Sequence, residues 1–529
     1  MSLKQHVTNT LYYDDPNLST KKEKIKMKIT FSKENIIGQA DKMIYGHFLE
    51  HFHRQVYDGI YDPTSKFADE DGFRTDVLEA MRKIKTPIIR WPGGCYVSAY
   101  DWHYGVGKTR IPTYDKAWRV EESNEFGTDE FVKLCRKLDC EPYICTNAGT
   151  GSAEEMSNWV EYCNIENMGR FAKERIENGY PEPHNVKFWS IGNENWGGHE
   201  IGSKDAPEWG KLVRESAKMM LRVDPTLELS AASIGDLDWN VNLLRAAGSY
   251  LDWISVHDYW DFTPDGVTYI DYDTAMLRTG ADICRNINKV RAYLTAFGLE
   301  KKIKIAYDEW NLRGWYHPNV MDIWYRDIKR TEDAEFYKNN VIGERSKNDL
   351  NSTYTMADAL FSAAFLNTCL RNCDIVKMAC FSPIVNTRGA IFTHKDGIVL
   401  RSTYFVFELY TALLKDTVLD IWTKDVPTIT GMDGRHKKTV DKVDTVVTYG
   451  DGQYAISAIN KSRDEDITLD LRTLDGELSQ MRISVLNGPS VDSYNDIDRT
   501  EVKVTYGEWE SYKDSVTLPA HSVCIIEIK

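Results

Sequence analysis

VKFWSIGNE at residues 186–194 is the stretch on which the fold of this chain depends. It begins as a short, mostly apolar run and ends in the polar pair Asn193 and Glu194. The stretch KIKIAYDEW at residues 302–310 repeats the pattern and places Glu309 near the end of a second run. Short apolar runs bounded by turn signals are typical of strands buried on both faces of a parallel sheet. Both stretches therefore predict parallel strands that end in a carboxylate.

Further runs of the same kind bring the expected number of strands to eight. The eight runs cover residues 43–50, 86–94, 141–149, 186–194, 227–235, 253–260, 302–310 and 376–386. Segments with charged residues on one face, such as 128–138 and 207–223, lie between them and predict amphipathic helices. Eight alternating strand and helix units predict the α/β class and a closed (β/α)8 TIM barrel. The functional groups of such a barrel lie at the carboxyl ends of its strands.

The pattern changes near residue 405, where short alternating strands separated by turns replace the strand and helix units. TVVTYGDGQYAISAIN (445–460) and VTLPAHSVCIIEIK (516–529) show this pattern, which predicts a β-sandwich. The strand MKITF at residues 27–31 precedes the barrel and is expected to join the sandwich. The predicted parts are a flexible polar leader (1–26), the N-terminal sandwich strand (27–40), the barrel (41–404) and the β-sandwich (405–529).

Length and composition exclude several classes of protein. A chain of 529 residues exceeds one ordinary domain, which agrees with a barrel and a smaller partner. The net charge of -15 argues against a nucleic-acid partner. Residues 1–26 contain no apolar run, so we expect a cytoplasmic protein without a membrane partner. The ten cysteines include no CxxC pair and no zinc spacing, so we expect reduced thiols, no metal site and no cofactor.

Polar side chains gather at the predicted carboxyl ends of the barrel strands. They are Glu50, Arg90, Asn147, Asn193, Glu194, His257, Tyr259, Glu309 and Asn386. Buried carboxylates are costly unless they are paired or hydrogen-bonded, so a barrel built only for stability would not need several of them. Their expected convergence on one mouth of the barrel indicates a site at which charge develops during a reaction.

Glu194 and Glu309 end the fourth and seventh predicted strands, whose ends meet at the same barrel mouth. Cleavage of a glycosidic bond needs one carboxylic acid to protonate the leaving oxygen and one carboxylate at the anomeric carbon. A separation of about 5 to 5.5 Å between the two groups produces retention through a glycosyl-enzyme intermediate. Asn193 is expected to hydrogen-bond the 2-hydroxyl of the sugar. The alternative is that each Glu is an ordinary strand-end residue, paired with a lysine or capping a helix.

The surroundings are expected to separate the roles of the two carboxyl groups. Glu194 has to be protonated to act as an acid, and the nearby charge of Glu309 would disfavour its ionisation. Glu309 has to stay ionised instead. Hydrogen bonds from His257, Tyr259 or Arg90 would favour that form.

Short motifs at the strand ends are shared with a known family. They are YGHFLEH at 45–51, IIRWPGG at 88–94, GNE at 192–194, SVHDY at 255–259 and YDEWN at 307–311. With LPAHSVCIIEI at 518–528, they resemble the family 51 glycoside hydrolases, a group of α-L-arabinofuranosidases. The resemblance implies a retaining exo-enzyme that releases terminal α-L-arabinofuranosyl residues from arabinose-containing oligosaccharides without a cofactor. By the same resemblance, the enzyme is expected to be a homo-oligomer, a hexamer.

The resemblance also implies roles for individual residues. Glu194 would be the general acid/base and Glu309 the nucleophile. The expected substrate-binding residues are Glu50, Arg90, Cys95, Trp102, Asn193, His257, Tyr259 and Asn386. Among them, Trp102 would wall the side of the site that holds the leaving group.

Two positions depart from the family pattern. Cys95 follows the PGG motif where the family usually has Asn, and Pro383 stands where a Gln is typical of the last barrel strand. A sugar hydroxyl left without a partner would cost about 1 to 3 kcal/mol. Asn386 or Arg388 could replace the lost donors. The departures keep two alternatives open: the same mechanism on β-D-galactofuranosides or as an endo-acting β-glucanase or xylanase, and a sugar-binding barrel without activity.

The segment 312–353 after the seventh predicted strand is long, polar and aromatic. Long loops in compact domains are more often functional than accidental. We therefore predict that this segment lines the substrate entrance, with an oligomer contact as the alternative.

Overall fold

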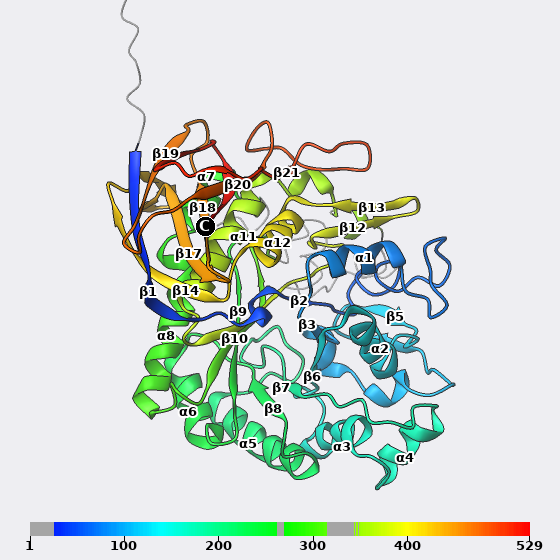
Figure 1. Cartoon of the computed structure of the whole chain (residues 1–529). Helices are drawn as coiled ribbons and strands as arrows, with labels where there is room; N and C mark the ends of the chain where they lie inside the picture. The colour runs from blue at the N-terminus through cyan, green and yellow to red at the C-terminus, as the bar shows by residue number, and fades with distance from the viewer. Residues whose placement is uncertain (1–25, 262–268, 315–342, 344, 348) are drawn as a thin grey trace, which may run out of the picture.

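The computed structural model describes residues 26–261, 269–314, 343, 345–347 and 349–529, and shows a barrel and a second sheet joined by helices (Figure 1). The barrel strands are β2 (Gly46–Phe48), β3 (Ile88–Trp91), β6 (Glu141–Thr146), β7 (Phe188–Ile191), β8 (Glu228–Ala231), β9 (Trp253–Tyr259), β10 (Lys304–Asn311) and β11 (Val376–Phe381). They are parallel and hydrogen-bonded in the order β8-β7-β6-β3-β2-β11-β10-β9. A bridge between Ala232 and Ser255 closes the ring between β8 and β9. The predicted TIM barrel is confirmed, because each predicted run overlaps one of these strands.

Helices lie outside the barrel strands and connect them (Figure 1). They are α1 (Thr75–Lys83), α2 (Thr128–Leu138), α3 (Ala153–Asn164), α4 (Arg170–Glu177), α5 (Ala206–Val223), α6 (Leu237–Ala247), α7 (Tyr272–Leu277), α8 (Ala281–Phe297), α11 (Met356–Arg371) and α12 (Ser402–Leu413). Helices α2 and α5 cover the segments predicted to be amphipathic. Helix α5 begins at a capping box, in which Asp205 accepts a hydrogen bond from the backbone of Glu208 at 2.8 Å and Glu208 accepts one in return at 3.2 Å.

The amino-terminal end of the barrel is filled by apolar side chains. This cluster consists of Phe48, Ile88, Tyr143, Phe188, Trp253, Ala306, Met378 and Cys380, which come from every barrel strand except β8. TIM barrels pack such layers of inward side chains and are therefore not hollow. This packed cluster supports the polar groups at the carboxyl ends of the strands rigidly.

The second sheet forms a β-sandwich that takes in both ends of the described chain. Its strands are β1 (Lys26–Gln39), β14 (Thr417–Lys424), β17 (Val443–Gly450), β18 (Gln453–Asn460), β19 (Ile467–Thr473), β20 (Gln480–Asn487), β21 (Lys503–Thr505), β22 (Glu510–Ser511), β23 (Ser515–Leu518) and β24 (Ser522–Ile528). Strand β1 pairs antiparallel with β14 and parallel with β19. Inward side chains such as Phe31, Ile456 and Ile526 share one apolar core. The prediction of a C-terminal sandwich with an added N-terminal strand is confirmed.

Helices α11 and α12 lie between the barrel and the sandwich. Helix α11 contacts β11 of the barrel as well as β17 and β18 of the sandwich, and its residues are buried on all sides. Helix α12 contacts β20 and β24 and ends at Leu413, before β14 begins at Thr417. The predicted boundary between residues 404 and 405 falls inside α12. The change of domain follows this helix, whose mainly apolar sequence carries no amphipathic signal because it is buried between the two parts.

Smaller elements complete the described structure. The hairpins are β4 (Thr113–Asp115) with β5 (Val120–Glu122), β12 (Ile391–His394) with β13 (Gly397–Leu400), and β15 (Thr428–Asp433) with β16 (His436–Asp441). The short 3-10 helices are η1 (Lys42–Tyr45), η2 (Cys95–Ala99), η3 (Trp102–Gly105) and η4 (Asn351–Thr353). The predictions for the leader at 1–25 and for most of 312–353 lie outside the described residues.

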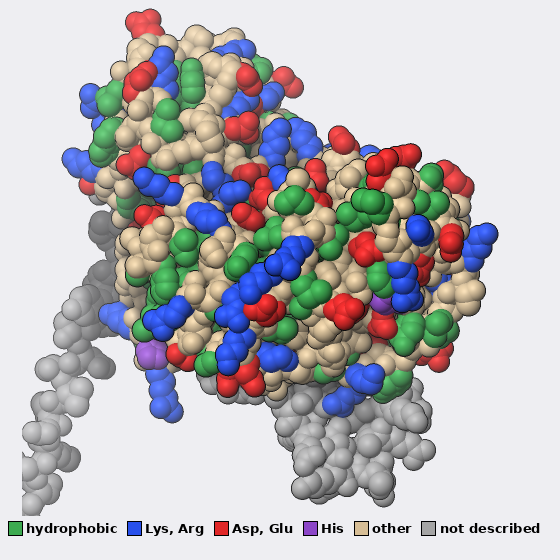
Figure 2. All heavy atoms as spheres, turned by 90° about the horizontal axis from the view of Figure 1, so that it is seen from below, with side chains coloured by type: hydrophobic (Ala, Val, Ile, Leu, Met, Phe, Trp, Pro, Cys, Tyr) green, Lys and Arg blue, Asp and Glu red, His purple; other side chains and the backbone are tan. Residues whose placement is uncertain are grey.

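The side of the molecule drawn in Figure 2 has no continuous basic face. On that side, Lys and Arg side chains lie among Asp and Glu side chains and apolar ones. None of the helices in the described ranges has the length and apolar character needed to cross a membrane. All ten cysteines are described, and all are free thiols.

Candidate active site

Glu194 follows β7 and is presented by a tight turn. Gly192 has φ 71° and Glu194 has φ 43°, both in the left-handed region. A Cβ atom at position 192 would lie 2.0 Å from Oδ1 of Asn195, so only glycine fits there. Side chains such as Glu rarely adopt a positive φ, and such strain is concentrated at functional sites. The backbone of the turn thus holds Glu194 in a position that costs stability.

Glu309 lies near the end of β10, which is separated from β7 in the ring by β8 and β9. The register between β10 and β9 shifts between Ala306 and Glu309, and such irregularities turn a side chain from its regular direction. Oε2 of Glu309 accepts a hydrogen bond from Nη1 of Arg90 at 2.8 Å, and Oε1 accepts one from the hydroxyl of Tyr259. Both donors stabilise a negative charge on Glu309.

The structure brings Glu194 and Glu309 together. One carboxylate oxygen of each residue and a ring nitrogen of His257 all lie within 4.8 Å of one another. Carboxyl groups stand about 5 to 5.5 Å apart in retaining glycosidases and about 6.5 to 9.5 Å apart in inverting ones. The two carboxyl groups are therefore close enough to act on one glycosidic bond.

His257, on β9, lies between the two carboxylates. Its Nδ1 atom is 2.9 Å from Oε1 of Glu194 and 3.5 Å from Oε2 of Glu309. Its Nε2 atom is 3.2 Å from Oδ1 of Asp308. Burial lowers the pKa of His257, but the three surrounding carboxylates outweigh burial and raise the pKa to about 10. His257 therefore carries a positive charge at neutral pH and offsets the repulsion between its neighbours.

The surroundings of Glu194 correct the expectation that Glu309 would keep it protonated. Oε2 of Glu194 is 2.9 Å from Nε2 of His199, in addition to the contact of Oε1 with His257. Burial raises the pKa of Glu194, but the hydrogen bonds and charges of His199 and His257 outweigh burial and lower it. The hydrogen bond with Glu194 in turn raises the pKa of His199. Glu194 is therefore ionised in the resting site and has the protonated His257 beside it.

Arg90 connects the residues that follow two different strands. Its Nη1 atom donates to Glu309, and its Nη2 atom donates to Oδ1 of Asn193 at 2.7 Å. The amide nitrogen of Asn193 donates to Oε1 of Glu200 at 3.0 Å. Because the amide oxygen faces Arg90 and the amide nitrogen faces Glu200, the orientation of Asn193 is fixed on both sides.

Glu50 lies at the end of β2 and is 1% exposed. Its Oε1 atom accepts hydrogen bonds from the backbone of Tyr96 at 3.1 Å and from Nε1 of Trp118 at 3.0 Å. Burial and the charge of Glu309 raise the pKa of Glu50 to about 8. A neutral carboxyl group can donate a hydrogen bond as well as accept one, which suits a sugar hydroxyl. A Cβ atom at Gly94 would lie 3.4 Å from an oxygen of both Glu50 and Glu309, so the backbone here faces the two carboxyl groups.

Two of the predicted sugar contacts have other partners. Trp102 is 1% exposed, and its ring is stacked on that of Trp159 with 6.0 Å between ring centroids. It is therefore part of the core in this structure, and its contact with a leaving group stays a prediction. The amide nitrogen of Asn386 donates to the backbone oxygen of Arg54 at 2.6 Å and to Oγ1 of Thr393 at 2.7 Å. Asn386 therefore connects Arg54 to Thr393 in this structure, and its contact with a sugar stays a prediction.

The two positions that depart from the family pattern both lie next to site residues. The Sγ atom of Cys95 is within 4.8 Å of a carboxylate oxygen of Glu200. Pro383 follows Ser382 through a cis peptide bond. The hydroxyl of Ser382 lies 2.8 Å from that of Tyr259, which is the residue that donates to Glu309. Ser382 therefore takes part in holding Tyr259 against Glu309, where Pro383 supplies no polar group.

Sequence reasoning missed part of this hydrogen-bond network. The missed residues are His199, Glu200, Asp308 and Ser382. Asp308 accepts hydrogen bonds from the hydroxyls of Tyr143 and Ser255, both at 2.7 Å, and its charge inside an apolar strand was a usable signal. The sequence WGGHE at 196–200, in the loop after a catalytic strand, was a weaker signal for His199 and Glu200.

Comparisons with known proteins agree with this geometry. The family model described as "Alpha-L-arabinofuranosidase 1 domain" matches residues 80–275, and the model described as "Alpha-L-arabinofuranosidase C-terminal domain" matches residues 308–522. The chain is 31% identical to an intracellular exo-alpha-(1->5)-L-arabinofuranosidase of Acetivibrio thermocellus, over 93% of this chain and 96% of the relative. It is 36% identical to intracellular exo-alpha-(1->5)-L-arabinofuranosidase 1 of Bacillus subtilis, over 72% and 74%.

Solved structures show the same similarity. The crystal structure of an alpha-L-arabinofuranosidase from Thermotoga maritima in complex with arabinose matches with a TM-score of 0.82 and 31% identity. The match covers 95% of this chain and 99% of that one. Both the barrel and the sandwich are therefore shared with that protein.

Proposed function

We propose, because this chain belongs to the α-L-arabinofuranosidases of glycoside hydrolase family 51, that it is a retaining exo-enzyme which releases terminal α-L-arabinofuranosyl residues from oligosaccharides. The observation that carries the proposal is the proximity of Glu194 and Glu309, whose carboxylate oxygens lie within 4.8 Å of each other. This spacing suits a double displacement, in which both groups act on one glycosidic bond.

In the first step, an oxygen of Glu309 forms a bond with the anomeric carbon, and the bond from that carbon to the leaving oxygen breaks. The proton reaches the leaving oxygen from Glu194, which receives it from His199 or His257. The lowered pKa of Glu194 makes its protonated form a strong acid, and the two histidines keep that proton within reach.

In the second step, a water oxygen forms a bond with the anomeric carbon, and the bond to Glu309 breaks. The carboxylate of Glu194 takes the proton of this water, so the same residue acts first as an acid and then as a base. Two displacements on opposite faces of the sugar restore the original configuration. Asn193 and Glu50 border this space and can bind furanose hydroxyls, which supports a small terminal sugar as the substrate.

The proposal also includes the exo mode of cleavage and a location in the cytoplasm. Both bacterial relatives described above are named intracellular exo-alpha-(1->5)-L-arabinofuranosidases, which supports short arabino-oligosaccharides in the cytoplasm as substrates. The proposed homo-oligomer, a hexamer, rests on the resemblance to the family. Size-exclusion chromatography with light scattering tests the oligomeric state. Product analysis on linear arabino-oligosaccharides tests the exo mode, because an exo-enzyme releases only single sugars at early times.

Hydrolysis of p-nitrophenyl α-L-arabinofuranoside by the wild type, Glu194→Ala and Glu309→Ala tests the central assignment. Glu121→Gln, at an exposed position on β5, is the matched control and should keep full activity. Both active-site variants should lose at least about 100-fold in turnover. Undiminished turnover in either variant would remove the assignment.

Added azide separates the two roles. In Glu194→Ala, azide should attack the glycosyl-enzyme and give the α-azide, and in Glu309→Ala it should attack the substrate and give the β-azide. Proton NMR of the products distinguishes the two anomers. The opposite pattern would exchange the two roles.

The alternatives open at the sequence level are tested in parallel. p-Nitrophenyl β-D-galactofuranoside tests the second sugar, and the viscosity of xylan and β-glucan solutions tests an endo mode. A faster rate on the galactofuranoside, or a fall in viscosity, would replace the proposed substrate. Arabinofuranoside binding without turnover would indicate a sugar-binding barrel.

A further inference from the structure

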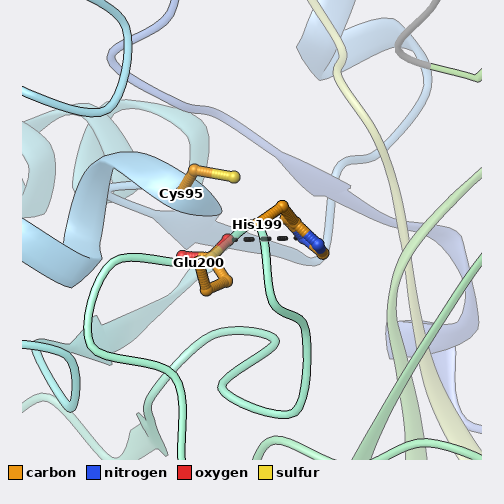
Figure 3. Close-up of side chains that lie close together, drawn as sticks. All are labelled: Cys95, His199 and Glu200. Atoms are coloured by element: carbon orange, nitrogen blue, oxygen red, sulfur yellow. Dashed lines mark ion pairs between the residues drawn. The ribbon is translucent and has the colours of Figure 1, made fainter. Parts of the chain in front are cut away.

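Cys95, His199 and Glu200 form a group of possible metal ligands beside the catalytic carboxylates. The Sγ atom of Cys95, a ring nitrogen of His199 and a carboxylate oxygen of Glu200 all lie within 4.8 Å of one another. Figure 3 shows the three side chains gathered between the start of η2 and the loop that follows β7. The ligands come from two distant segments, so no spacing motif in the sequence indicated them.

We propose that these three side chains bind one divalent cation of the zinc and cadmium class, and that the bound cation inhibits hydrolysis. Thiolate, imidazole and carboxylate are the side-chain types that bind zinc, whereas a thiolate disfavours Mg²⁺ and Ca²⁺. Three protein ligands leave a fourth position for water or for a neighbouring carboxylate. The inhibitory part rests on the proposed function, and the binding part does not.

The geometry needs only a small adjustment to enclose an ion. Zinc bonds of about 2.0 to 2.3 Å place the ligand atoms about 3 to 4 Å apart, so the group has to contract by at most about 1 Å. Nε2 of His199 already lies 3.9 Å from Oε1 of Glu200. Glu200 is anchored by hydrogen bonds from Ser98 at 2.7 Å and from Asn193 at 3.0 Å. The side chain of His199 is 34% exposed and follows Gly198, around which there is open space. His199 can therefore move onto an ion that Cys95 and Glu200 hold.

The charge around the thiol favours a cation. Burial raises the pKa of Cys95, and the carboxylates of Glu200, Glu50 and Glu194 raise it further. At neutral pH the thiol therefore keeps its proton. When the ion binds, a sulfur–metal bond forms and one proton is released to solvent. The ionised carboxylate of Glu194 attracts the incoming ion and offsets part of the cost of this release.

Inhibition follows from the second contact of His199. Its Nε2 atom lies 2.9 Å from Oε2 of Glu194, the general acid of the proposed mechanism. A ring nitrogen bound to a metal carries no proton for transfer to Glu194.

Titration of the metal-free protein with Cd²⁺ tests the binding. A thiolate bound to cadmium gives an ultraviolet charge-transfer band, which we expect in the wild type and in Cys284→Ser but not in Cys95→Ser. Cys284 is the matched control, because it is partly exposed on α8, away from this group. Competition with a chromogenic chelator should show zinc binding at least about tenfold weaker in Cys95→Ser and His199→Gln than in the wild type.

Hydrolysis of p-nitrophenyl α-L-arabinofuranoside with and without Zn²⁺, compared within each variant, tests the inhibition. The wild type and Cys284→Ser should lose activity with zinc and regain it with a chelator, and Mg²⁺ should have no effect. Cys95→Ser should need a zinc concentration at least about tenfold higher for the same inhibition.

The absence of the cadmium band in the wild type, its persistence in Cys95→Ser, or equal zinc inhibition in Cys95→Ser would overturn the site. The last outcome would indicate an ion at Glu194, His257 and Glu309, or at Asp101, His103 and Glu155, the other clusters of this kind in the described part of the chain. A cadmium band in a wild type that hydrolyses no arabinofuranoside would reject the proposed function and leave the metal site standing.

Discussion

The imidazole of His257 is hydrogen-bonded to Glu194 at 2.9 Å, and the same ring nitrogen lies 3.5 Å from Glu309. One cation thus contacts the proposed acid and the proposed nucleophile at once. When Glu309 forms the covalent intermediate, it loses its charge, which is one of those that raise the pKa of His257. The proton of His257 then becomes easier to transfer to Glu194 while the leaving oxygen is being protonated. The contact of His257 with both residues couples the two events.

The variant His257→Gln removes this cation and keeps a hydrogen-bonding side chain. The turnover number should fall at least about 100-fold, because proton supply to Glu194 is lost. The pKa of Glu194 should rise, since a hydrogen bond and a charge that lower it are gone. The alkaline limb of kcat/KM reports loss of the acidic proton. It should move to lower pH, because the proton is no longer held by His257, whose pKa is about 10, and a pH profile measures this shift. His436→Gln, exposed on β16, is the control. An unmoved limb would show that His257 has only a structural role.

The variant Tyr259→Phe removes the hydroxyl that donates to Oε1 of Glu309. Hydrogen bonds to charged groups contribute about 1.5 to 3 kcal/mol, so kcat/KM should fall by about 10- to 100-fold. Tyr114→Phe, at a position that is 57% exposed, is the control and should behave as the wild type. A loss below about threefold would mean that Arg90 alone holds the nucleophile.

The fold could be predicted from the sequence because its signal is periodic. The eight apolar runs became the eight barrel strands, and the alternating pattern after them became the sandwich. The position of Glu194 and Glu309 followed from the same pattern, since parallel strands of a barrel end at one mouth. The expected boundary at 404/405 falls inside α12, because α12 is apolar on most of its surface and carries neither a helical nor a strand period.

The details of the site could not be predicted, because they depend on which side chains a turn brings into contact. His199 reaches Glu194 only through the turn that starts at Gly192 with its positive φ. No spacing rule describes that turn. Asn386 was expected at the sugar because it follows the last strand, yet its amide group forms hydrogen bonds with Arg54 and Thr393. Position along a strand thus predicts proximity to the mouth and does not predict the partner of a side chain.

Glu200 should make the stability of the protein depend on pH. Burial and the charge of Glu194 raise the pKa of Glu200 from 4.5 to about 7. Its folded pKa lies above its unfolded pKa, so its contribution to stability is full below about pH 4.5 and is lost as the pH rises through about 7. The loss amounts to about 3 kcal/mol at most. In Glu200→Gln, which is neutral throughout, the Tm should fall less than in the wild type between about pH 5 and about pH 8.

Thermal unfolding followed by circular dichroism at several pH values checks this expectation. Glu300→Gln, at an exposed position, is the control and should keep the pH dependence of the wild type. The same slope of Tm against pH in Glu200→Gln and in the wild type would contradict a raised pKa at Glu200.

Lysine should not be able to replace Arg90 in activity, although the substitution keeps the positive charge of the side chain. Its two terminal nitrogens donate to Glu309 at 2.8 Å and to Asn193 at 2.7 Å, and its side chain is fully buried. The single ammonium group of lysine cannot reproduce this fork. In Arg90→Lys, kcat/KM should fall at least about 100-fold, because one of the two partners loses a charged donor inside the protein. Arg435→Lys, at an exposed turn, should have no effect.

A double-mutant cycle separates orientation from mere packing at Arg90. If Arg90 acts partly by orienting Asn193, the double variant Arg90→Lys with Asn193→Ala should lose less activity than the product of the two single losses, since both changes remove the same contact. The loss in kcat/KM for each variant is measured at the pH optimum of the wild type. Fully multiplicative losses would show that Arg90 and Asn193 act independently, and the hydrogen bond between them would then have no part in holding the sugar.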